Sequence, residues 1–381
     1  MLKIDGAYLE GGGQIMRTSL ALSTLTLQPF EISGIRKGRP NPGLQPQHLS
    51  CVKALEEFCN ASSEGSEVGS QRLVFYPGKP QSRTLSVDIG TAGSLTLLLQ
   101  ALLPAALFAP GKVRFRLVGG TNVSHSPPVE YFSSVLLPQL SRFAKIDFSL
   151  LQRGYFPKGG GRLDIEVKPS FHISDYDTFA DFRAAASGQL SPIALFQRGR
   201  LLKISGVSHA SADLKKGEVA ERQAGAARSF LLQHLQKLGV ACPMTIQSEY
   251  SDAFSTGSGI SLFAHFAAHD KDEPAQLNPI ILGSDSLGER GKRAEVVGQE
   301  AASALAKEIS SGACVDHYLA DQLIPFLAVA GGKIQASEVT NHCRTNIFVV
   351  EQFLRAPSAS ADVHIRKKFE VDEDKKIVSA T

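Results

Sequence analysis

Hydrophobic residues recur in a similar order at three places along the chain. In each place an apolar run with helical spacing is followed by a break and a strand, and in the first two places a glycine-rich segment precedes the run. The copies cover residues 11–35, 91–120 and 319–339, and within the second copy Val113–Leu117 alternates as a half-buried strand does. Such self-similarity indicates one supersecondary unit used several times. Because helices and strands alternate, the pattern predicts an α/β fold, with a large domain of three repeated α/β units whose sheets are covered by helices.

The segment 171–282 differs in pattern from the copies on either side of it. It opens with polar sequence and then holds strands around a helical run, Lys216–Leu238, that is rich in Ala, Glu, Arg and Leu. We expect a smaller inserted α/β domain here, with the core domain formed by 1–170 and 283–356. This insert carries no ligand-binding motif, so we expect it to lie outside any nucleotide pocket. The charged C-terminal tail, 357–381, is expected to be a solvated extension or disordered.

The composition narrows the class of protein. The 381 residues are 43% hydrophobic and 20% charged, as in a globular chain longer than one average domain. The longest apolar run, Ala101–Ala109, contains Pro104 and is too short to span a membrane, and the N-terminus lacks the apolar stretch of a signal peptide. Five cysteines without a CxxC pair argue against a disulfide framework and a zinc site, so we expect a cytoplasmic protein. With a net charge of +3, any contact with nucleic acid must come from local patches.

Two segments combine consecutive glycines with cations. Glu10–Arg17 contains three glycines and opens a helix, whose first N–H groups are free to bind an anion that Arg17 could also face. Phe156–Arg162 places two cations beside exposed backbone amides. The structural alternatives are a tight turn into a helix for the first segment and a hairpin connection for the second.

The segment Arg36–His48 is a stiff basic loop. No acidic residue occurs between Ile32 and Leu55, and prolines and glycines restrict the loop backbone. A rigid loop holds cations around a phosphate at a lower cost in entropy. The alternative is an ordinary solvated charged surface.

Two later segments place polar side chains near the start of helices. In Asp316–Pro325, Tyr318 and Asp321 are spaced so that they share one helical face, as an aromatic ring and a polar group would in a nucleotide pocket. Thr340–Ile347 follows a strand and contains His342. Taken alone, the first is most often a capped helix start, and a lone histidine is most often structural.

Together, these segments resemble the RNA 3′-terminal phosphate cyclase family. The matching patterns are D-G-x-x-x-E-G-G-G-Q-I-x-R at Asp5–Arg17, R-x-G-R-x-x-P-G-L-x-x-Q-H at Arg36–His48, G-Y-x-P-K-G-G-G at Gly154–Gly161, Y-L-A-D-Q at Tyr318–Gln322 and H-x-x-T-N at His342–Asn346. The resemblance runs from Asp5 to about Phe353 and is weakest across the insert. It implies a large domain of three similar α/β units and a smaller inserted α/β domain.

The resemblance also implies roles for individual residues. His342 matches the histidine that accepts AMP, and Glu10 sits where the family places a residue near the catalytic divalent cation, Mg or Mn. The positions that match the ATP pocket are Gln100, Pro127, Tyr318, Asp321 and Gln322. The expected contacts for the RNA terminal phosphate or the nucleotide phosphates are Arg17, Arg36, Arg39 and Gln47.

The implied reaction uses ATP to convert an RNA 3′-phosphate into a 2′,3′-cyclic phosphate. A 2′-hydroxyl cannot readily attack a neighbouring phosphate monoester, because the group expelled would be oxide or hydroxide. A histidine adenylate solves this problem, since AMP passes from the imidazole to the RNA phosphate and then leaves when the 2′-hydroxyl attacks. The developing charge needs cations and a divalent metal, which substrate oxygens would mainly hold.

The chain departs from the family pattern at a few positions, and two other functions were considered. Lys37 stands where alanine is common, and Cys343 and Arg344 stand where apolar residues are frequent. The main alternative is a non-catalytic cyclase-like factor in ribosomal RNA processing, a branch that lacks the catalytic histidine. An enolpyruvyl transferase built from the same kind of repeated unit is the other. The presence of His342 and Glu10 favours the catalytic cyclase.

Overall fold

The computed structural model describes residues 1–268, 273–355 and 369–380, and within these residues the strands form four four-stranded sheets. The first sheet belongs to β1 (Leu2–Asp5), α1 (Gly13–Thr26), β2 (Phe30–Ser33), α2 (Pro46–Cys59), β3 (Ser62–Glu64) and β4 (Arg72–Tyr76). The second belongs to β5 (Thr84–Asp88), α3 (Leu95–Ala106), β6 (Val113–Gly119), α4 (Val129–Tyr131), the π-helical turn η1 (Phe132–Leu136), α5 (Leu137–Leu140), β7 (Ala144–Gln152) and β8 (Gly161–Pro169). Each of these runs is one repeated unit.

A third unit is assembled from segments far apart in the sequence. It consists of β9 (Ile193–Leu195), α9 (His317–Ala330), β14 (Gly332–Gln335), α10 (Asn341–Arg355), β15 (Phe369–Asp372) and β16 (Ile377–Ala380). In all three units the first two strands are parallel, and the last two form a hairpin that pairs antiparallel with the second strand. The prediction of an α/β fold made of repeated units is confirmed.

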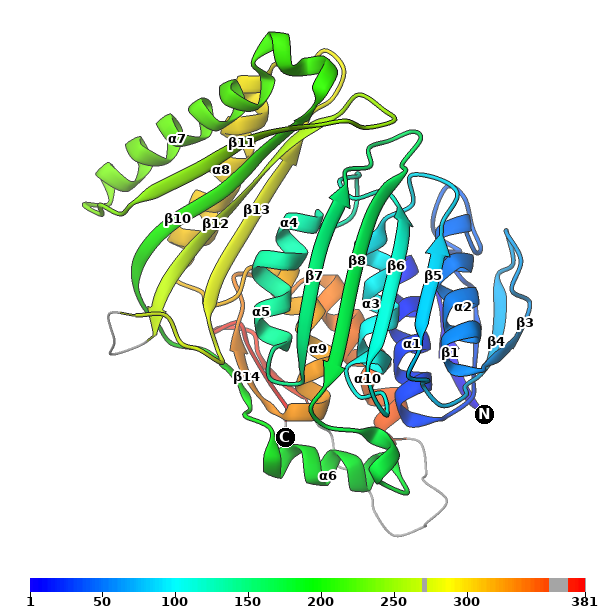
Figure 1. Ribbon diagram of the computed structural model, residues 1–381. Coiled ribbons are helices and arrows are strands. Elements are labelled where there is room, and N and C mark those ends of the chain that lie inside the picture. Colours follow the sequence, from blue (N-terminus) through cyan, green and yellow to red (C-terminus); the bar gives the residue numbers. More distant parts are fainter. Residues whose placement is uncertain (269–272, 356–368, 381) are drawn as a thin grey trace.

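The chain between β9 and α9 forms the fourth sheet. It contains β10 (Arg198–Ser211), α7 (Val219–Lys237), β11 (Met244–Ser251), β12 (Ser258–Ala268), β13 (Ile280–Leu287) and α8 (Ala294–Ser310), with strand order β11-β10-β12-β13. Figure 1 shows this sheet as a separate layer with α7 and α8 on one side of it. We call these elements the inserted unit.

The inserted unit runs from 198 to 310, whereas the sequence placed the insert at 171–282. Helix α6 (Phe179–Gln189) packs on α9, and β9 pairs with β14, so the chain just before β10 contacts the third unit. Helix α8 packs on α7 and β13. An amphipathic pattern shows that a helix covers a sheet but not which sheet, so the sequence could not place α8. The division of the chain into domains stays a prediction.

The expectation that the charged tail is solvated or disordered is wrong for residues 369–380. These residues supply the hairpin β15–β16 that completes the third sheet, and Phe369 and Val378 are buried. Within residues 369–380 most of the charged side chains lie in the exposed turn between the two strands. Glu373 in that turn pairs with Arg344, both Nη–Oε distances being 2.6 Å. Residues 357–368 of the predicted tail lie outside the described residues.

The helices of the three units pack against one another behind the β5–β8 sheet (Figure 1). Helix α1 contacts α3 and α10, and α9 contacts α10. Helix α3 is apolar on almost every face and buried, which suits the centre of this layer. No helix in residues 1–268, 273–355 or 369–380 combines the length and apolar character needed to cross a bilayer. The cytoplasmic location stays a prediction.

The C-terminal hairpin predicts a stability effect. Phe369→Ala should lower the free energy of unfolding by about 3–5 kcal/mol, because it leaves a cavity under a fully buried ring. Lys375→Ala, in the exposed turn of the same hairpin, is the control and should change it by no more than about 0.5 kcal/mol. Urea denaturation of both variants checks this. Equal, small effects would mean that the hairpin does not pack on the third unit.

Candidate active site

A cavity of about 430 Å³ lies where the N-terminal turns of α1, α9 and α10 meet. Side chains from α1, α3, α9 and α10 line it, together with the loop before α4 and the end of β13. These lining residues include Gln14, Arg17, Thr18, Gln100, Pro127, Asp285, Leu287, Tyr318, Asp321, Gln322, Phe326, His342 and Asn346. Because helix N-termini carry partial positive charge and unpaired N–H groups, this meeting point favours anions.

His342 is held by two residues from the other end of the chain. Its Nδ1 contacts Oε1 of Gln14, and its Nε2 lies 3.0 Å from Oε2 of Glu10. Nε2 of Gln14 donates a hydrogen bond of 3.1 Å to the backbone oxygen of His342. The amide of Gln14 thus contacts both the backbone and the ring of the same histidine.

These contacts set the tautomer of the imidazole. A backbone oxygen can only accept, so the NH₂ group of Gln14 must face it, and Oε1 must then face Nδ1 of His342. Since Oε1 accepts, Nδ1 carries a proton; Nε2 presents a lone pair once the Glu10 carboxylate, 3.0 Å away, holds a cation or a proton of its own instead of accepting from the ring. Burial lowers the pKa of His342, and Arg17 and Arg39 lower it further against the opposing effect of Glu10. A neutral imidazole with a free Nε2 is a nucleophile.

Two arginines beside the histidine have buried donors without a partner. The Nε atoms of Arg17 and Arg39 are shielded from solvent and make no hydrogen bond to the described residues. Burial lowers the pKa of Arg17. An unpaired buried donor costs about 1–3 kcal/mol, which an anion bound here would recover. These donors therefore indicate a site for phosphate groups.

Gly13 allows two basic side chains to approach the start of α1. A Cβ on Gly13 would overlap the imidazole of His48 and would lie 3.1 Å from Nη1 of Arg17. Nδ1 of His48 accepts a hydrogen bond of 3.0 Å from the backbone N–H of Gln45. Burial, with Arg17 and Arg36 nearby, lowers the pKa of His48 to about 3, so the ring is neutral. Its other nitrogen therefore carries a proton and can donate.

Two carboxyl groups of the cavity have pKa values raised into the neutral range. Burial raises the pKa of Asp321 to about 8, against the opposing effect of Arg17. Burial also raises the pKa of Asp285 to about 7, with Glu130 and Asp316 adding to the shift. A neutral carboxyl can donate as well as accept a hydrogen bond, as recognition of a nucleobase edge requires.

The part of the cavity farther along α9 is both aromatic and polar. The ring of Tyr318 is 44% exposed and packs edge-on against Tyr131, with centroids 6.0 Å apart. Nε2 of Gln322 donates to the backbone oxygen of Tyr318 over 3.0 Å. Pro127 is tied to α3 because its backbone oxygen accepts a 2.7 Å hydrogen bond from Oγ1 of Thr96. The five residues expected in an ATP pocket all line this one cavity.

The remaining predicted residues lie at or near the edge of the cavity. Arg39 reaches Oε2 of Glu10 over 3.4 Å. Arg36 has a left-handed backbone and donates from Nε to the oxygen of Asn41 over 3.3 Å, and Oε1 of Gln47 accepts from the N–H of Ser94 over 3.4 Å. Neither Arg36 nor Gln47 lines the cavity.

Sequence reasoning missed several residues that form the site. Gln14, Thr18 and Asn346 tie α1, α9 and α10 together: Oγ1 of Thr18 donates to Asn346, which donates to the backbone oxygen of Asp321, both over 2.7 Å. Gln14 and Asn346 belong to the quoted motifs, which were the signal that could have found them. Asp285 comes from β13 of the inserted unit, and no motif marks it.

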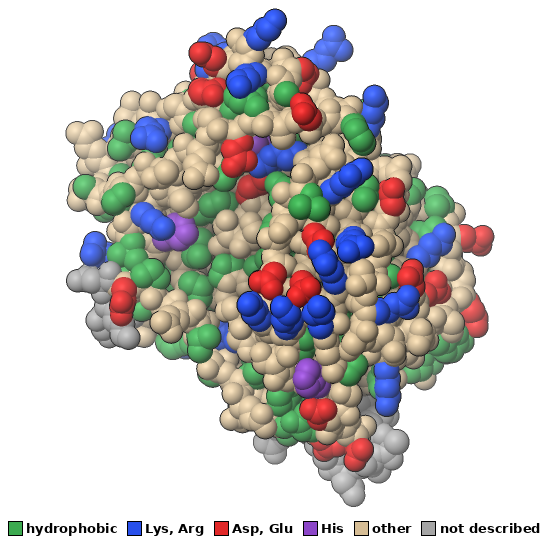
Figure 2. Space-filling view, in the orientation of Figure 1, with side chains coloured by type: hydrophobic (Ala, Val, Ile, Leu, Met, Phe, Trp, Pro, Cys, Tyr) green, Lys and Arg blue, Asp and Glu red, His purple; other side chains and the backbone are tan. Residues whose placement is uncertain are grey.

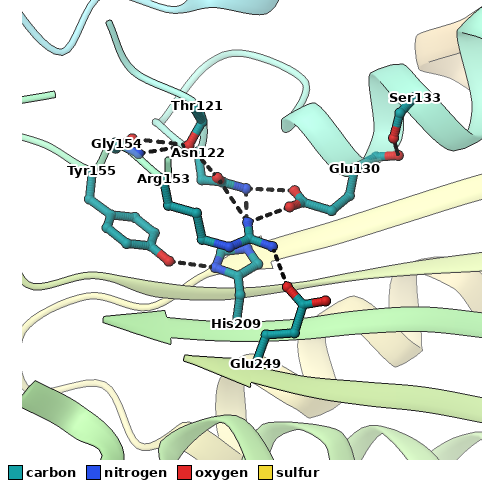
Figure 3. Close-up of polar contacts among 9 residues, drawn as sticks. All are labelled: Thr121, Asn122, Glu130, Ser133, Arg153, Gly154, Tyr155, His209 and Glu249. Carbon is teal, nitrogen blue, oxygen red and sulfur yellow. Dashed lines mark hydrogen bonds and ion pairs between the residues drawn. The ribbon is translucent and has the colours of Figure 1, made fainter. Parts of the chain in front are cut away.

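A buried polar network supports the loop that lines the cavity beside Pro127 (Figure 3). Arg153 forms a buried ion pair with Glu130, just after this loop, and a 3.0 Å pair with Glu249 on β11. Nδ2 of Asn122, just before the loop, lies 2.7 Å from Glu130 and 3.1 Å from Nε2 of His209 on β10. Both ends of the loop are thus fixed against the inserted unit.

Fold and site together describe an α/β protein of repeated units, in which a histidine, two arginines and three helix N-termini meet at or beside one cavity. A family model described as RNA 3′-terminal phosphate cyclase matches residues 8–358, and the chain belongs to that family. It is 46% identical over 355 residues to an RNA 3′-terminal phosphate cyclase of Pyrococcus abyssi, covering 93% of each chain. The protein of the same name from Pyrococcus furiosus is 45% identical over 93% of each chain, and that of Ignicoccus hospitalis is 40% identical over 97% of each.

The raised pKa of Asp321 predicts a dependence of stability on pH. Its folded-state pKa of about 8 lies above the value of about 3.9 in unfolded chains, so between these values folding takes up a proton. This contribution to stability is full at low pH and is lost as the pH rises through 8, by up to about 1.4 kcal/mol per pH unit. Asp321→Asn lacks the titration. Chemical denaturation between pH 5 and 9 should therefore show that the free energy of unfolding of the variant increases relative to that of the wild type as the pH rises. A difference in unfolding free energy that does not change with pH would contradict the raised pKa.

Proposed function

We propose that the chain uses ATP to convert an RNA 3′-terminal phosphate into a 2′,3′-cyclic phosphate, through AMP carried covalently on Nε2 of His342. The observation that carries this proposal is the pair of contacts from Gln14, which places a proton on Nδ1 and turns Nε2 toward Glu10 at the cavity edge. Family membership and the relatives' names support the overall reaction. The histidine adenylate and the roles of single residues are implied by the family motifs, and the geometry supports them.

In the first step the lone pair of Nε2 attacks the α-phosphorus of ATP, and pyrophosphate leaves with the electrons of the broken P–O bond. Nδ1 keeps its proton and donates it in a hydrogen bond to Oε1 of Gln14. This acceptor stabilises the positive charge that develops on the ring. The lowered pKa of His342 keeps the ring neutral and reactive beforehand. The partial charges at the three helix N-termini and the Arg17 guanidinium would stabilise the phosphate charge.

The next two steps move AMP to the RNA and then release it. An oxygen of the RNA 3′-phosphate attacks the phosphorus of the adenylate, the P–N bond breaks, and the electron pair returns to Nε2. The product is an RNA-(3′)pp(5′)-A anhydride. The 2′-hydroxyl then loses its proton and attacks the 3′-phosphorus, closing the ring and expelling AMP. We propose that Arg36, Arg39 and Gln47 receive the RNA end, because they lie outside the cavity that ATP would fill.

The residues near His342 fit a divalent cation that substrate oxygens mainly hold. Among the described residues no three His, Cys, Asp or Glu side chains are grouped as a metal site. Glu10 offers one carboxylate, 3.0 Å from the attacking nitrogen, where it would repel an unscreened triphosphate. A Mg or Mn ion here would screen the phosphate charge and act as a Lewis acid. Glu10 would hold it together with phosphate oxygens.

The cavity around Tyr318 suits the adenosine of ATP. Tyr318 and Pro127 offer surfaces for the flat base, and Gln100, Gln322 and the protonated Asp321 offer hydrogen bonds to its edge or to the ribose. Asp285 adds a second carboxyl with a raised pKa, from the inserted unit.

A non-catalytic cyclase-like factor is the alternative from another class. It would have no need for an Nε2 of His342 turned toward Glu10 or for buried arginine donors kept unpaired beside it. An enolpyruvyl transferase has no use for a histidine that carries AMP. The geometry around His342 therefore favours the catalytic cyclase over both.

The nucleophile and its orienting amide give the first functional prediction. His342→Ala should remove all covalent labelling of the protein by α-labelled ATP and all cyclisation. Gln14→Leu should slow adenylation about 10- to 100-fold, the range known for partners that orient a reactive histidine. Gln28→Leu, beyond the far end of α1, is the matched control. Rapid-quench labelling measures each rate, and an adenylate on the His342→Ala protein would disprove the assignment.

The positions of Tyr318 and Arg39 predict separate effects on the two halves of the reaction. Tyr318→Ala should weaken adenylation, since losing a stacked base contact costs about 1–3 kcal/mol. Arg39→Ala should mainly slow AMP transfer to RNA, because its side chain does not line the cavity. Single-turnover assays time the two steps separately. If Arg39→Ala slows adenylation as much as Tyr318→Ala does, the basic loop serves the ATP phosphates instead.

A further inference from the structure

Two phenylalanine rings are exposed on neighbouring turns of the molecule. Phe156, in the turn between β7 and β8, is 73% exposed, and Phe254, in the turn between β11 and β12, is 58% exposed. Single exposed apolar side chains are common, whereas apolar side chains that gather in one place can mark an interaction site. Neither residue belongs to the cavity around His342.

The two turns are interlocked, although they come from the second unit and the inserted unit (Figure 1). The backbone N–H of Lys158 donates to Oγ of Ser255 over 3.1 Å. Gly160 has a left-handed backbone, and a Cβ there would overlap the ring of Phe254, so this ring rests directly on the glycine. The absence of a side chain at Gly160 of the K-G-G-G motif therefore lets an aromatic ring pack against the backbone.

The buried polar network holds the start of the turn that carries Phe156 (Figure 3). The hydroxyl of Tyr155, next to Phe156, lies 2.9 Å from Nδ1 of His209. Arg153 is paired with Glu130 and Glu249 on either side. Side chains fixed before a ligand arrives lose little entropy when it binds.

Two cations beside these rings carry unbalanced charge. On the outer face of the β5–β8 sheet, cations lie among acidic side chains, as Figure 2 shows; Arg114, for example, pairs with Asp164 over 2.6 Å. Lys158 and Arg162 are exposed, and neither forms an ion pair with any residue in 1–268, 273–355 or 369–380. The turn that carries Phe156 therefore adds two exposed cations to the aromatic rings, while the neighbouring turn carries Asp252.

The turn that carries Phe156 is connected to the active site by a series of close contacts. Gly159 lies against the backbone of Ala92. Ser94, two residues on, donates its N–H to Gln47 of the basic loop over 3.4 Å. The next residue of that loop is His48, which lies against Gly13 at the start of α1. The turn that carries Phe156 and the start of α1 are thus linked through neighbouring loops.

We propose that Phe156, Lys158, Arg162 and Phe254 form a platform for the single-stranded nucleotides that precede the 3′ end of the RNA. We call these four residues the rim platform. Bases stack on the two rings, and the cations contact the phosphates between them; every base offers a flat face, so this recognition does not depend on sequence. The inference rests on the proposed function, because it adds to that site a subsite for the body of the RNA.

The test compares a long and a short RNA. Wild-type protein should have at least a tenfold lower KM for a 3′-phosphorylated oligoadenylate of ten nucleotides than for the corresponding dinucleotide. The double variant Phe156→Ala/Phe254→Ala should raise the KM for the decamer at least tenfold. Its KM for the dinucleotide, its kcat and its adenylation by ATP alone should stay within about twofold of wild type. Lys158→Ala and Arg162→Ala should each reduce the slope of log affinity against log salt by about 0.7.

Matched controls come from the outer side of the inserted unit. Leu232→Ala on α7 removes an exposed apolar side chain, and Lys307→Ala on α8 removes an exposed cation. Both should bind the decamer as wild type does. Equal KM values of wild type for the two RNAs, or an equal loss by the double variant on both, would overturn the rim platform.

Binding of the fluorescent decamer, measured by anisotropy without ATP, separates this inference from the proposed function. If the wild type forms no cyclic phosphate on either RNA, the proposed function fails. The rim platform then stands if the double variant binds the decamer at least tenfold more weakly than wild type, and it falls if the two bind equally.

Discussion

The site depends on one side-chain amide that joins the two ends of the chain. Gln14, on the first helix of the first unit, contacts both the ring and the backbone of His342, which lies 328 positions later in the third unit. That contact sets which ring nitrogen holds the proton, and it exists only when α1 and α10 are packed together. The hairpin β15–β16 completes the sheet of the third unit, to which α10 also belongs. The position of His342 therefore depends on the packing of the first and third units.

Charge is arranged around the same contact in a way that suits a polyphosphate. Arg17 and Arg39 keep buried donors without partners, and they help to lower the pKa of His342. Asp321, deeper in the cavity, is held neutral by burial rather than left as a negative charge. A cavity that is positive at one end and neutral but polar at the other suits phosphates next to a nucleoside.

The sequence was informative where a function needs a particular residue in a particular backbone setting. His342, Glu10 and Tyr318 were recognisable because their motifs combine glycines, cations and an aromatic in fixed order, and the structure brings all three to one site. It was less informative where the partner comes from a distant element. No motif marks Asp285, and its raised pKa follows from burial that only the folded chain creates. The amphipathic pattern of α8 did not reveal which sheet this helix covers. The charged residues around Glu373 made the segment look solvated, so the two short strands on either side of them were not predicted. These strands are buried because β16 pairs with β14.

The tautomer of His342 is the central claim of this account, and ¹⁵N NMR of histidine-labelled protein measures it directly. At neutral pH, with Mg and without nucleotide, we predict a protonated Nδ1 and an unprotonated Nε2 for His342, identified by comparison with the His342→Ala spectrum. Loss of that pattern in Gln14→Leu would attribute it to the amide. A proton on Nε2, with Nδ1 unprotonated, would contradict the account, because the nitrogen that faces the phosphate site would then have no lone pair with which to attack.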